Sequence, residues 1–159
     1  MAQIKEKDIV NYIVKHWDTY FPELKFCRTE YILRDFRVDI FASMNVNLKE
    51  LGIRNDDYIT NIPVFFEAKF DSNMRDLLCE LNKQIQFRDF YINKGKCFCI
   101  LCVLSDKYDG DMVKFMEDND IIMYKYSFEN DDLTTLKIKE YNSKTFIIED
   151  DIEDKCLEN

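Results

Sequence analysis

The sequence contains a single histidine, His16, among its 159 residues. One histidine cannot build a histidine-rich zinc site, and His16 falls on the polar side of an N-terminal amphipathic segment, which does not suit a histidine general base of the usual kind. The chain also lacks an apolar run long enough to span a membrane, and residues 1–7 are too polar to begin a secretory signal. These absences predict a cytoplasmic protein with no membrane partner.

Cysteine is present, but not in a pattern that favours a disulfide framework or a metal cluster. Six cysteines without a secretory signal are typical of a reducing compartment, where thiols stay reduced, so we expect no disulfides. Cys97, Cys99 and Cys102 lie in one apolar run. Because Cys97 and Cys99 would share one strand face while Cys102 takes the other, and no clear fourth ligand follows, they are interpreted as small hydrophobic residues of a buried strand.

A surplus of basic residues is also missing. The formal net charge is −9, which disfavours a generic nucleic-acid binder because Lys and Arg make the phosphate contacts that dominate affinity. Residues 146–159 hold six acids and one base, a net of −5, which leaves −9 − (−5) = −4 for the remainder. The composition predicts one domain over residues 1–145 and an acidic, disordered tail over residues 146–159.

Hydrophobic periodicity predicts an α/β protein with a central mixed β-sheet flanked by helices. Residues 43–61 are predicted to be a polar insertion that joins two strands expected to be adjacent. The expected elements are a helix over 5–20, strands over 25–33, 37–42 and 63–69, a long helix over 71–95, a strand over 96–104, a short helix over 109–117, and strands over 121–128 and 133–141.

Charged residues interrupt two of these strands. In the strand 63–69, side chains alternate between faces, so Glu67 and Lys69 point the same way. In the strand 37–42, Val38, Ile40 and Ala42 are expected on one face and Asp39 on the other. If the two strands are neighbours, Asp39 and Glu67 converge beside Lys69, and two carboxylates with a lysine suit a hard divalent cation and an activated water.

Asp39 and the triplet Glu67-Ala68-Lys69 resemble the pattern of the PD-(D/E)xK nuclease superfamily, an Asp on one strand and Glu-x-Lys on the next. The superfamily's Pro-Asp position reads Val38-Asp39 here. The resemblance covers residues 5–104 and implies a restriction-endonuclease-like core of order α-β-β-β-α-β, to which this chain adds α-β-β. It further implies a metal-dependent nuclease that holds Mg²⁺, or Mn²⁺ in its place, through Asp39, Glu67 and the Ala68 carbonyl.

The same resemblance implies roles for residues outside the motif. Lys69 would orient or deprotonate a water, while Gln84 and Glu30 would position the water network. Gln86 is an alternative to Gln84 as the glutamine of the following helix. Glu6 has two interpretations, an additional metal-site acid or a solvated carboxylate in the first turn of a helix.

Three interpretations of the function stay open. The first is a nuclease acting on nucleic acid, with DNA favoured and with a homodimer or a protein partner both compatible with the sequence. The second, suggested by the acidic surface, is a catalytically silent nuclease-like fold that binds a protein or mimics nucleic acid as an inhibitor. In the third, Asp39, Glu67 and Lys69 form a salt-bridge network on a solvated sheet face.

Overall fold

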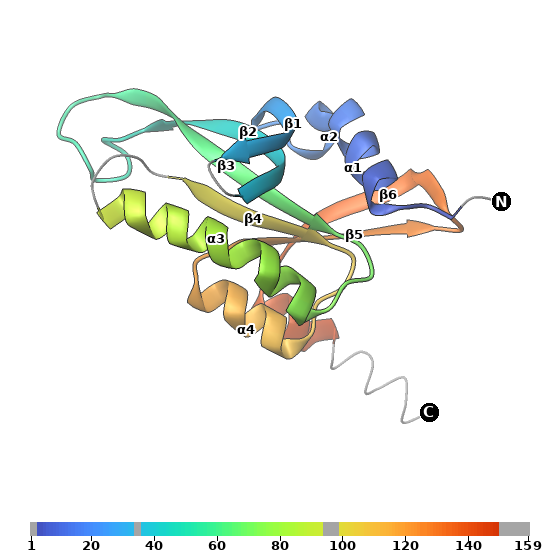
Figure 1. Cartoon of the computed structure of the whole chain (residues 1–159). Helices are drawn as coiled ribbons and strands as arrows, with labels where there is room; N and C mark the ends of the chain where they lie inside the picture. Colours follow the sequence, from blue (N-terminus) through green and yellow to red (C-terminus); the bar gives the residue numbers. More distant parts are fainter. Residues whose placement is uncertain (1–2, 34–35, 94–98, 150–159) are drawn as a thin grey trace.

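A six-stranded sheet with strand order β1-β2-β3-β4-β5-β6 forms the centre of the molecule (Figure 1). The computed structural model describes residues 3–33, 36–93 and 99–149, with the backbone alone for 91–93. The elements are α1 (Glu6–Lys15), α2 (Trp17–Tyr20), β1 (Lys25–Leu33), β2 (Phe36–Asn47), β3 (Ile59–Lys69), α3 (Met74–Asn93), β4 (Ile100–Ser105), α4 (Gly110–Asp118), β5 (Ile122–Glu129) and β6 (Asp132–Tyr141). The predicted α/β class and the predicted order of elements are confirmed.

The sheet is mixed in strand direction. β1, β2 and β3 pair antiparallel, β3, β4 and β5 pair parallel, and β5 and β6 pair antiparallel. The two parallel pairs need crossover connections, which α3 and α4 provide. β4 lies inside the sheet with helices over both faces, which explains why its sequence is apolar on both sides.

Two helical layers cover the two faces of the sheet (Figure 1). On one face, Ile13 of α1 and Trp17 of α2 pack in the same core cluster as Phe66. On the other face, Leu81 of α3 packs in the same cluster as Phe65, together with apolar residues of α4. Neighbouring residues of β3 therefore serve opposite layers, as the alternation of a strand requires.

The predicted N-terminal helix is interrupted. The helix expected over 5–20 ends as α1 at Lys15, and α2 begins at Trp17 after His16 leaves the helical conformation with φ −112° and ψ 34°. The Trp17 indole N–H donates to the Leu24 carbonyl at 2.8 Å. This bond ties α2 to the start of β1, so the break is set by a tertiary contact that helical periodicity does not reveal.

The predicted polar insertion over 43–61 is mostly a β-hairpin arm. β2 continues to Asn47 and β3 begins at Ile59, with pairs from Ser43↔Pro63 to Asn47↔Ile59, so only residues 48–58 form the loop. Pairing of β2 with β1 extends only as far as Ser43 of β2, and pairing of β3 with β4 begins only at Val64 of β3. Within the described residues, β2 and β3 pair only with each other along this arm. Met44 and Val46 alternate there with Ser43, Asn45 and Asn47, a strand pattern that the prediction of a polar insertion overlooked.

The predicted domain boundary at residue 146 falls inside a helix. Residues 143–149 are helical, and Phe146 packs against the core cluster of α3 and α4. The first four residues of the predicted tail therefore belong to the fold, and residues 150–159 lie outside the described part of the chain, as do Cys97 and the expected turn at 34–35. Of the helices within the described ranges, none has the length and apolar composition of a membrane span.

Candidate active site

The site begins where the β2–β3 ladder ends. The last pair is Ile40↔Phe66, so Asp39 and Glu67 occupy the next positions, where the two strands separate. Beyond this point the β3 backbone has N–H groups without a ladder partner on the β2 side, and such groups need an acceptor. Asp39 Oδ2 accepts the N–H of Ala68 at 2.8 Å, and the Asp39 carboxylate is thereby brought to the Glu-x-Lys strand.

A second carboxylate continues this row along β3. Glu6 Oε2, from α1, accepts the N–H of Phe70 at 3.2 Å. Since residues 68 and 70 present their N–H groups to the same edge of the strand, Asp39 and Glu6 lie one after the other along it. Glu6, for which the sequence allowed a solvated position, is therefore part of the site.

β2 itself turns where Asp39 lies. Val38 packs in the core cluster of α3 and α4, whereas Ile40 and Ala42 pack in the cluster of α1 and α2. The prediction that these three residues share one face is wrong. The strand alternation is therefore broken between Val38 and Ile40, and the intervening Asp39 accepts the Ala68 N–H.

Glu67 is the buried centre of the site, with 3% of its surface exposed. Gln84 of α3 donates from Nε2 to Glu67 Oε2 at 3.1 Å, and Lys69 Nζ lies 3.7 Å from Glu67 Oε1. The Lys69 side chain is 14% exposed. The main-chain carbonyl of Lys69 accepts a hydrogen bond of 2.6 Å from the Tyr126 hydroxyl. Gln84 is buried and contacts Glu67, while Gln86 is exposed.

One polar atom of this cluster lacks a partner. Gln84 Oε1 is buried and accepts no hydrogen bond from the residues that the structure describes. A buried acceptor without a donor is costly, and such groups are commonly matched by a water or an ion. The amide of Gln84 thus holds Glu67 with one end and offers an oxygen with the other.

The electrostatics of Glu67 are those of a crowded carboxylate. Burial raises the pKa of Glu67 most, and the charge of Asp39 and its hydrogen bonding to Glu67 raise it further. The nearby Lys69 ammonium lowers this pKa, but the net pKa stays well above its ordinary value. Two carboxylates that cannot both ionise cheaply are the arrangement that a bound cation relieves.

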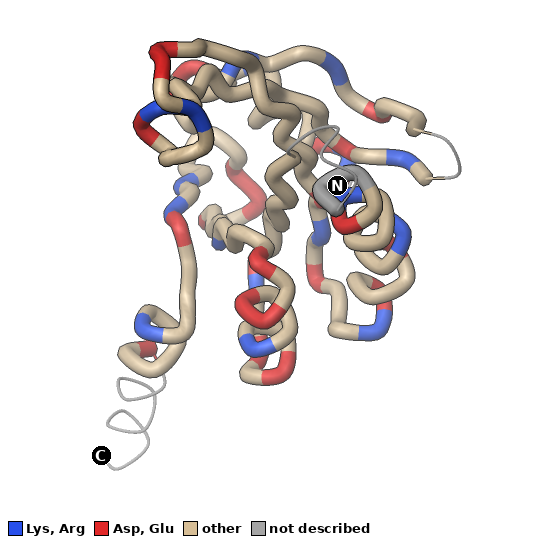
Figure 2. Tube along the Cα trace, turned by 90° about the vertical axis from the view of Figure 1, so that its left-hand side faces the viewer, with Lys and Arg blue, Asp and Glu red and all other residues tan. Residues whose placement is uncertain are grey.

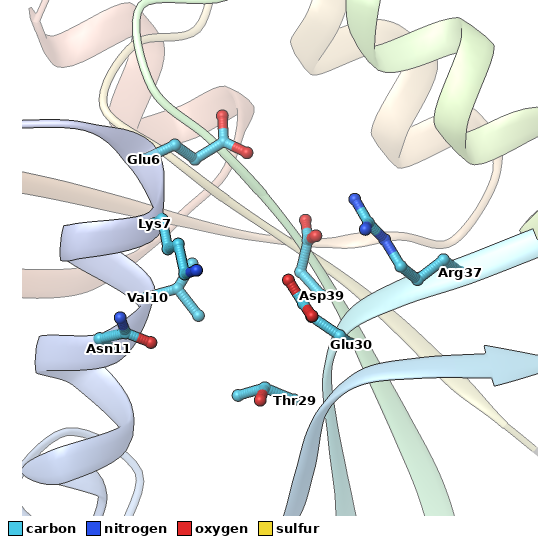
Figure 3. Close-up of a pocket in the computed structure, with 8 residues that line it drawn as sticks. All are labelled: Glu6, Lys7, Val10, Asn11, Thr29, Glu30, Arg37 and Asp39. Atoms are coloured by element: carbon cyan, nitrogen blue, oxygen red, sulfur yellow. The ribbon is translucent and has the colours of Figure 1, made fainter.

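A cleft of about 240 Å³ opens beside Asp39. Figure 3 shows Glu6 of α1 and Asp39 of β2 on two sides of it, with Glu30 and Arg37 contributed by β1 and β2. Glu30 is exposed and has a left-handed backbone with φ 50°. The cleft is lined by Glu6, Lys7, Val10, Asn11, Thr29, Glu30, Arg37 and Asp39.

The pKa of Glu6 is raised in the folded protein. Burial is the main cause, with the charges of Asp39 and Glu80 adding to it, while Lys69 and the Phe70 N–H oppose it. Glu80 also raises the pKa of Glu67. Sequence reasoning missed Glu80, although it precedes Gln84 by one helical turn and so lies on the same face of α3.

The donor set fits a hard divalent cation. Within residues 3–33, 36–93 and 99–149, no three His, Cys, Asp or Glu side chains are grouped to hold a metal ion. Asp39 and Glu67 alone would therefore need a main-chain carbonyl, for which Ala68 is the sequence-based candidate, and waters to complete the coordination. Mg²⁺ commonly binds through one or two carboxylates and keeps several waters, so this oxygen set suits it.

The six-stranded mixed sheet flanked by helices is consistent with a restriction-endonuclease-like fold. Comparisons with protein-family models and with curated proteins find no match. Among solved structures, a chain of an EndoMS–dsDNA complex is similar over 77% of this chain, with 13% sequence identity and a TM-score of 0.54. The match spans 44% of that chain's length, and it establishes a nuclease-like fold.

Proposed function

We propose that this protein is a metal-dependent nuclease that hydrolyses phosphodiester bonds of nucleic acid, with DNA as the main substrate. The observation that carries the proposal is the burial of Glu67 beside Asp39, within 3.7 Å of Lys69. A salt-bridge network on a solvated sheet face would leave these groups in water, whereas Glu67 is removed from water at a net cost. Strongly perturbed carboxylates next to a cleft are typical of functional sites.

Mg²⁺ is the proposed cofactor, with Mn²⁺ as a substitute. Asp39, Glu67 and the Ala68 carbonyl would hold it. When bound, the ion would supply neutralisation of the phosphate charge and a more acidic water. The raised pKa of Glu67 supports this assignment, since a cation between Asp39 and Glu67 favours the ionised form of both carboxylates.

The other residues of the site would position water and the Glu67 carboxylate, and would stabilise charge on the phosphate. Lys69, held at its carbonyl by Tyr126, keeps an ammonium beside Glu67, where it would orient a water and stabilise negative charge that develops on the phosphate. Gln84 fixes the Glu67 carboxylate through Nε2 and presents Oε1 as an acceptor for a water proton. Glu6 and Glu30 would order water in the cleft.

Nucleic acid is the substrate that the surroundings support. Lys7 and Arg37 line the cleft beside the carboxylates, and cations there can contact phosphates on either side of the reacting one. Figure 2 shows Lys and Arg interleaved with Asp and Glu on the side of the molecule that it presents. Binding of a nucleic acid through a few cations at the cleft does not require a wholly basic face. It is therefore compatible with the net charge of −9. The similarity to a chain solved with dsDNA adds support for DNA.

The test is cleavage of labelled single- and double-stranded DNA and RNA with and without Mg²⁺ or Mn²⁺. We expect cleavage only with metal, a loss of about a hundredfold or more in Asp39→Asn, and no change in Glu50→Gln. Glu50 is an exposed residue of the arm loop, so its variant matches the charge change away from the site. No cleavage of any substrate, together with no calorimetric Mn²⁺ binding, would overturn the proposal in favour of a silent, protein-binding fold.

A further inference from the structure

Two lysines lie directly opposite each other in the β5–β6 hairpin. Lys125 of β5 pairs with Lys139 of β6 in the antiparallel register, and their side chains, 25% and 58% exposed, point to the same face of the sheet. Like charges at directly opposite positions destabilise a strand pair. An anion between the two ammonium groups offsets this repulsion, so the position between Lys125 and Lys139 favours an anion.

In this structure the chain supplies that anion itself. Glu149, the last described residue of the helical segment 143–149, places Oε2 at 2.8 Å from Lys125 Nζ and Oε1 at 3.1 Å from Lys139 Nζ. The Tyr141 hydroxyl donates to Glu149 Oε2 at 2.8 Å. Burial raises the pKa of Glu149, but the three hydrogen bonds outweigh it and bring the pKa to about 2.

The three donors match a phosphate as well as a carboxylate. Two ammonium groups and one hydroxyl converge on a single anion whose oxygens they share, and charge-assisted bonds of this kind are formed equally by phosphate oxygens. A cleft of about 750 Å³ adjoins the lysine pair and gives a larger anion room to approach. Its lining includes Lys137 and Tyr20, a further cation and an aromatic ring.

The lysine pair shares a row with the candidate active site. Lys69 pairs with Ser105, Ser105 with Lys125, and Lys125 with Lys139, so all four residues point to the same sheet face. Neighbouring strands are about 4.8 Å apart, which separates the main chains of Lys69 and Lys125 by roughly 10 Å. Ser105, which lies between them, is buried, so a nucleic-acid strand that reaches Lys69 would bring another phosphate to the lysine pair by passing around the covered Ser105.

We propose that Lys125, Lys139 and Tyr141 form a phosphate-binding site for the nucleic-acid backbone, and that Glu149 occupies this site as an internal competitor in the absence of nucleic acid. The inference rests on the proposed function in one respect only, namely that the bound phosphate belongs to a nucleic acid. It requires neither metal nor cleavage. Free phosphate offers the same chemistry and is a separate arm of the test.

The experiment measures binding of fluorescent single- and double-stranded oligonucleotides by anisotropy in EDTA, for wild type, Glu149→Gln and Glu140→Gln. Glu140 is exposed on β6 next to Lys139, so its side chain points to the opposite face and its variant matches the charge change. We expect Glu149→Gln to bind about five- to twentyfold more tightly, with a slope of log affinity against log salt steeper by about 1–2. Glu140→Gln should change affinity less than about twofold.

Adding Lys125→Gln and Lys139→Gln to Glu149→Gln should cancel the gain. The phosphate arm follows the melting temperature in inorganic phosphate against chloride at equal ionic strength. One outcome is that phosphate raises the melting temperature of Glu149→Gln and not that of wild type, while oligonucleotide binding is not tighter. That result would assign the site to free phosphate and would overturn the proposal that it binds the nucleic-acid backbone. If Glu149→Gln does not fold in chloride, the proposal requires that phosphate restores folding by mass action.

Equal affinities of Glu149→Gln and Glu140→Gln, with no phosphate effect on melting, would overturn the site and leave Glu149 as a structural anchor of its helix. Because every arm is run in EDTA, this failure is distinguishable from failure of the proposed nuclease activity. A protein that binds through the lysine pair yet cleaves nothing would keep this inference and lose the proposed function.

Discussion

Glu67→Gln should stabilise the metal-free protein while abolishing its response to metal. The substitution keeps the size of the side chain and an oxygen that can accept the hydrogen bond from Gln84 Nε2, now 3.1 Å long. It removes a carboxylate that is 3% exposed and that repels Asp39. If Glu67 served only to stabilise the fold, the substitution would lower the stability of the protein. If Glu67 is a metal ligand, the substitution should raise that stability, because functional sites retain charges that are unfavourable without their ligand.

The magnitude follows from one stabilising and two destabilising contributions of the Glu67 charge. Lys69 Nζ lies 3.7 Å from Glu67 Oε1, and at an effective dielectric constant near 20 this attraction is worth about 4 kcal/mol, which the substitution forfeits. Against it stand the desolvation of a buried carboxylate, several kcal/mol, and the Asp39 repulsion. The raised pKa of Glu67 shows that the opposing terms are larger. We expect a net gain of about 1–3 kcal/mol, or about 3–9 °C in Tm for a chain of this size.

The gain should depend on pH in a defined direction. The folded protein holds a proton on Glu67 more tightly than the unfolded chain, whose pKa lies near the ordinary value of 4.5. The stability contributed by the protonated form is therefore fully present below that value and is lost as pH rises through the folded pKa. Wild type and Glu67→Gln should melt at similar temperatures near pH 4 and diverge as pH rises.

The assay is thermal unfolding by circular dichroism across that pH range, in EDTA and in Mn²⁺ at pH 8. At a Mn²⁺ concentration of about 100 times Kd, wild type should gain about 2.7 kcal/mol, and Glu67→Gln should gain nothing. The reasoning is refuted if Glu67→Gln melts below wild type in EDTA at pH 8. It is equally refuted if the two proteins respond alike to Mn²⁺.

Three further predictions follow from the same contacts. Lys69→Ala removes a cation beside the metal site, so calorimetric Mn²⁺ affinity should be equal or higher while cleavage falls by about a hundredfold or more; parallel losses of both would contradict separate roles. Gln84→Met should lower cleavage by about 10–100-fold, whereas the exposed Gln86→Met should leave it unchanged, and equal effects would exclude Gln84 as the positioning residue. Truncation before Glu149 should lower Tm by about 2–6 °C relative to truncation after it, because three hydrogen bonds are lost, and identical melting curves would contradict that role.

Features that depend on spacing within one element were predictable from the sequence. The alternation of strand 63–69 placed Glu67 and Lys69 on one face, and both line the same buried cluster. Strand 25–33 was predicted with the bounds that β1 has. The apolar run ending near Ser105 indicated an interior strand, because only a strand covered on both faces lacks polar alternation.

Tertiary structure alone decided which elements meet, because local periodicity orients a side chain but carries no information about register, twist or helix placement. The end of the ladder at Ile40↔Phe66 brought Asp39 to the Ala68 N–H, and the docking of α1 brought Glu6 to Phe70. The placement of α3 buried Gln84 and left its neighbour Gln86 in solvent. Glu149, which composition assigned to a tail, pairs with two lysines because the antiparallel register of β5 and β6 sets their ammonium groups side by side, where their mutual repulsion favours an anion between them.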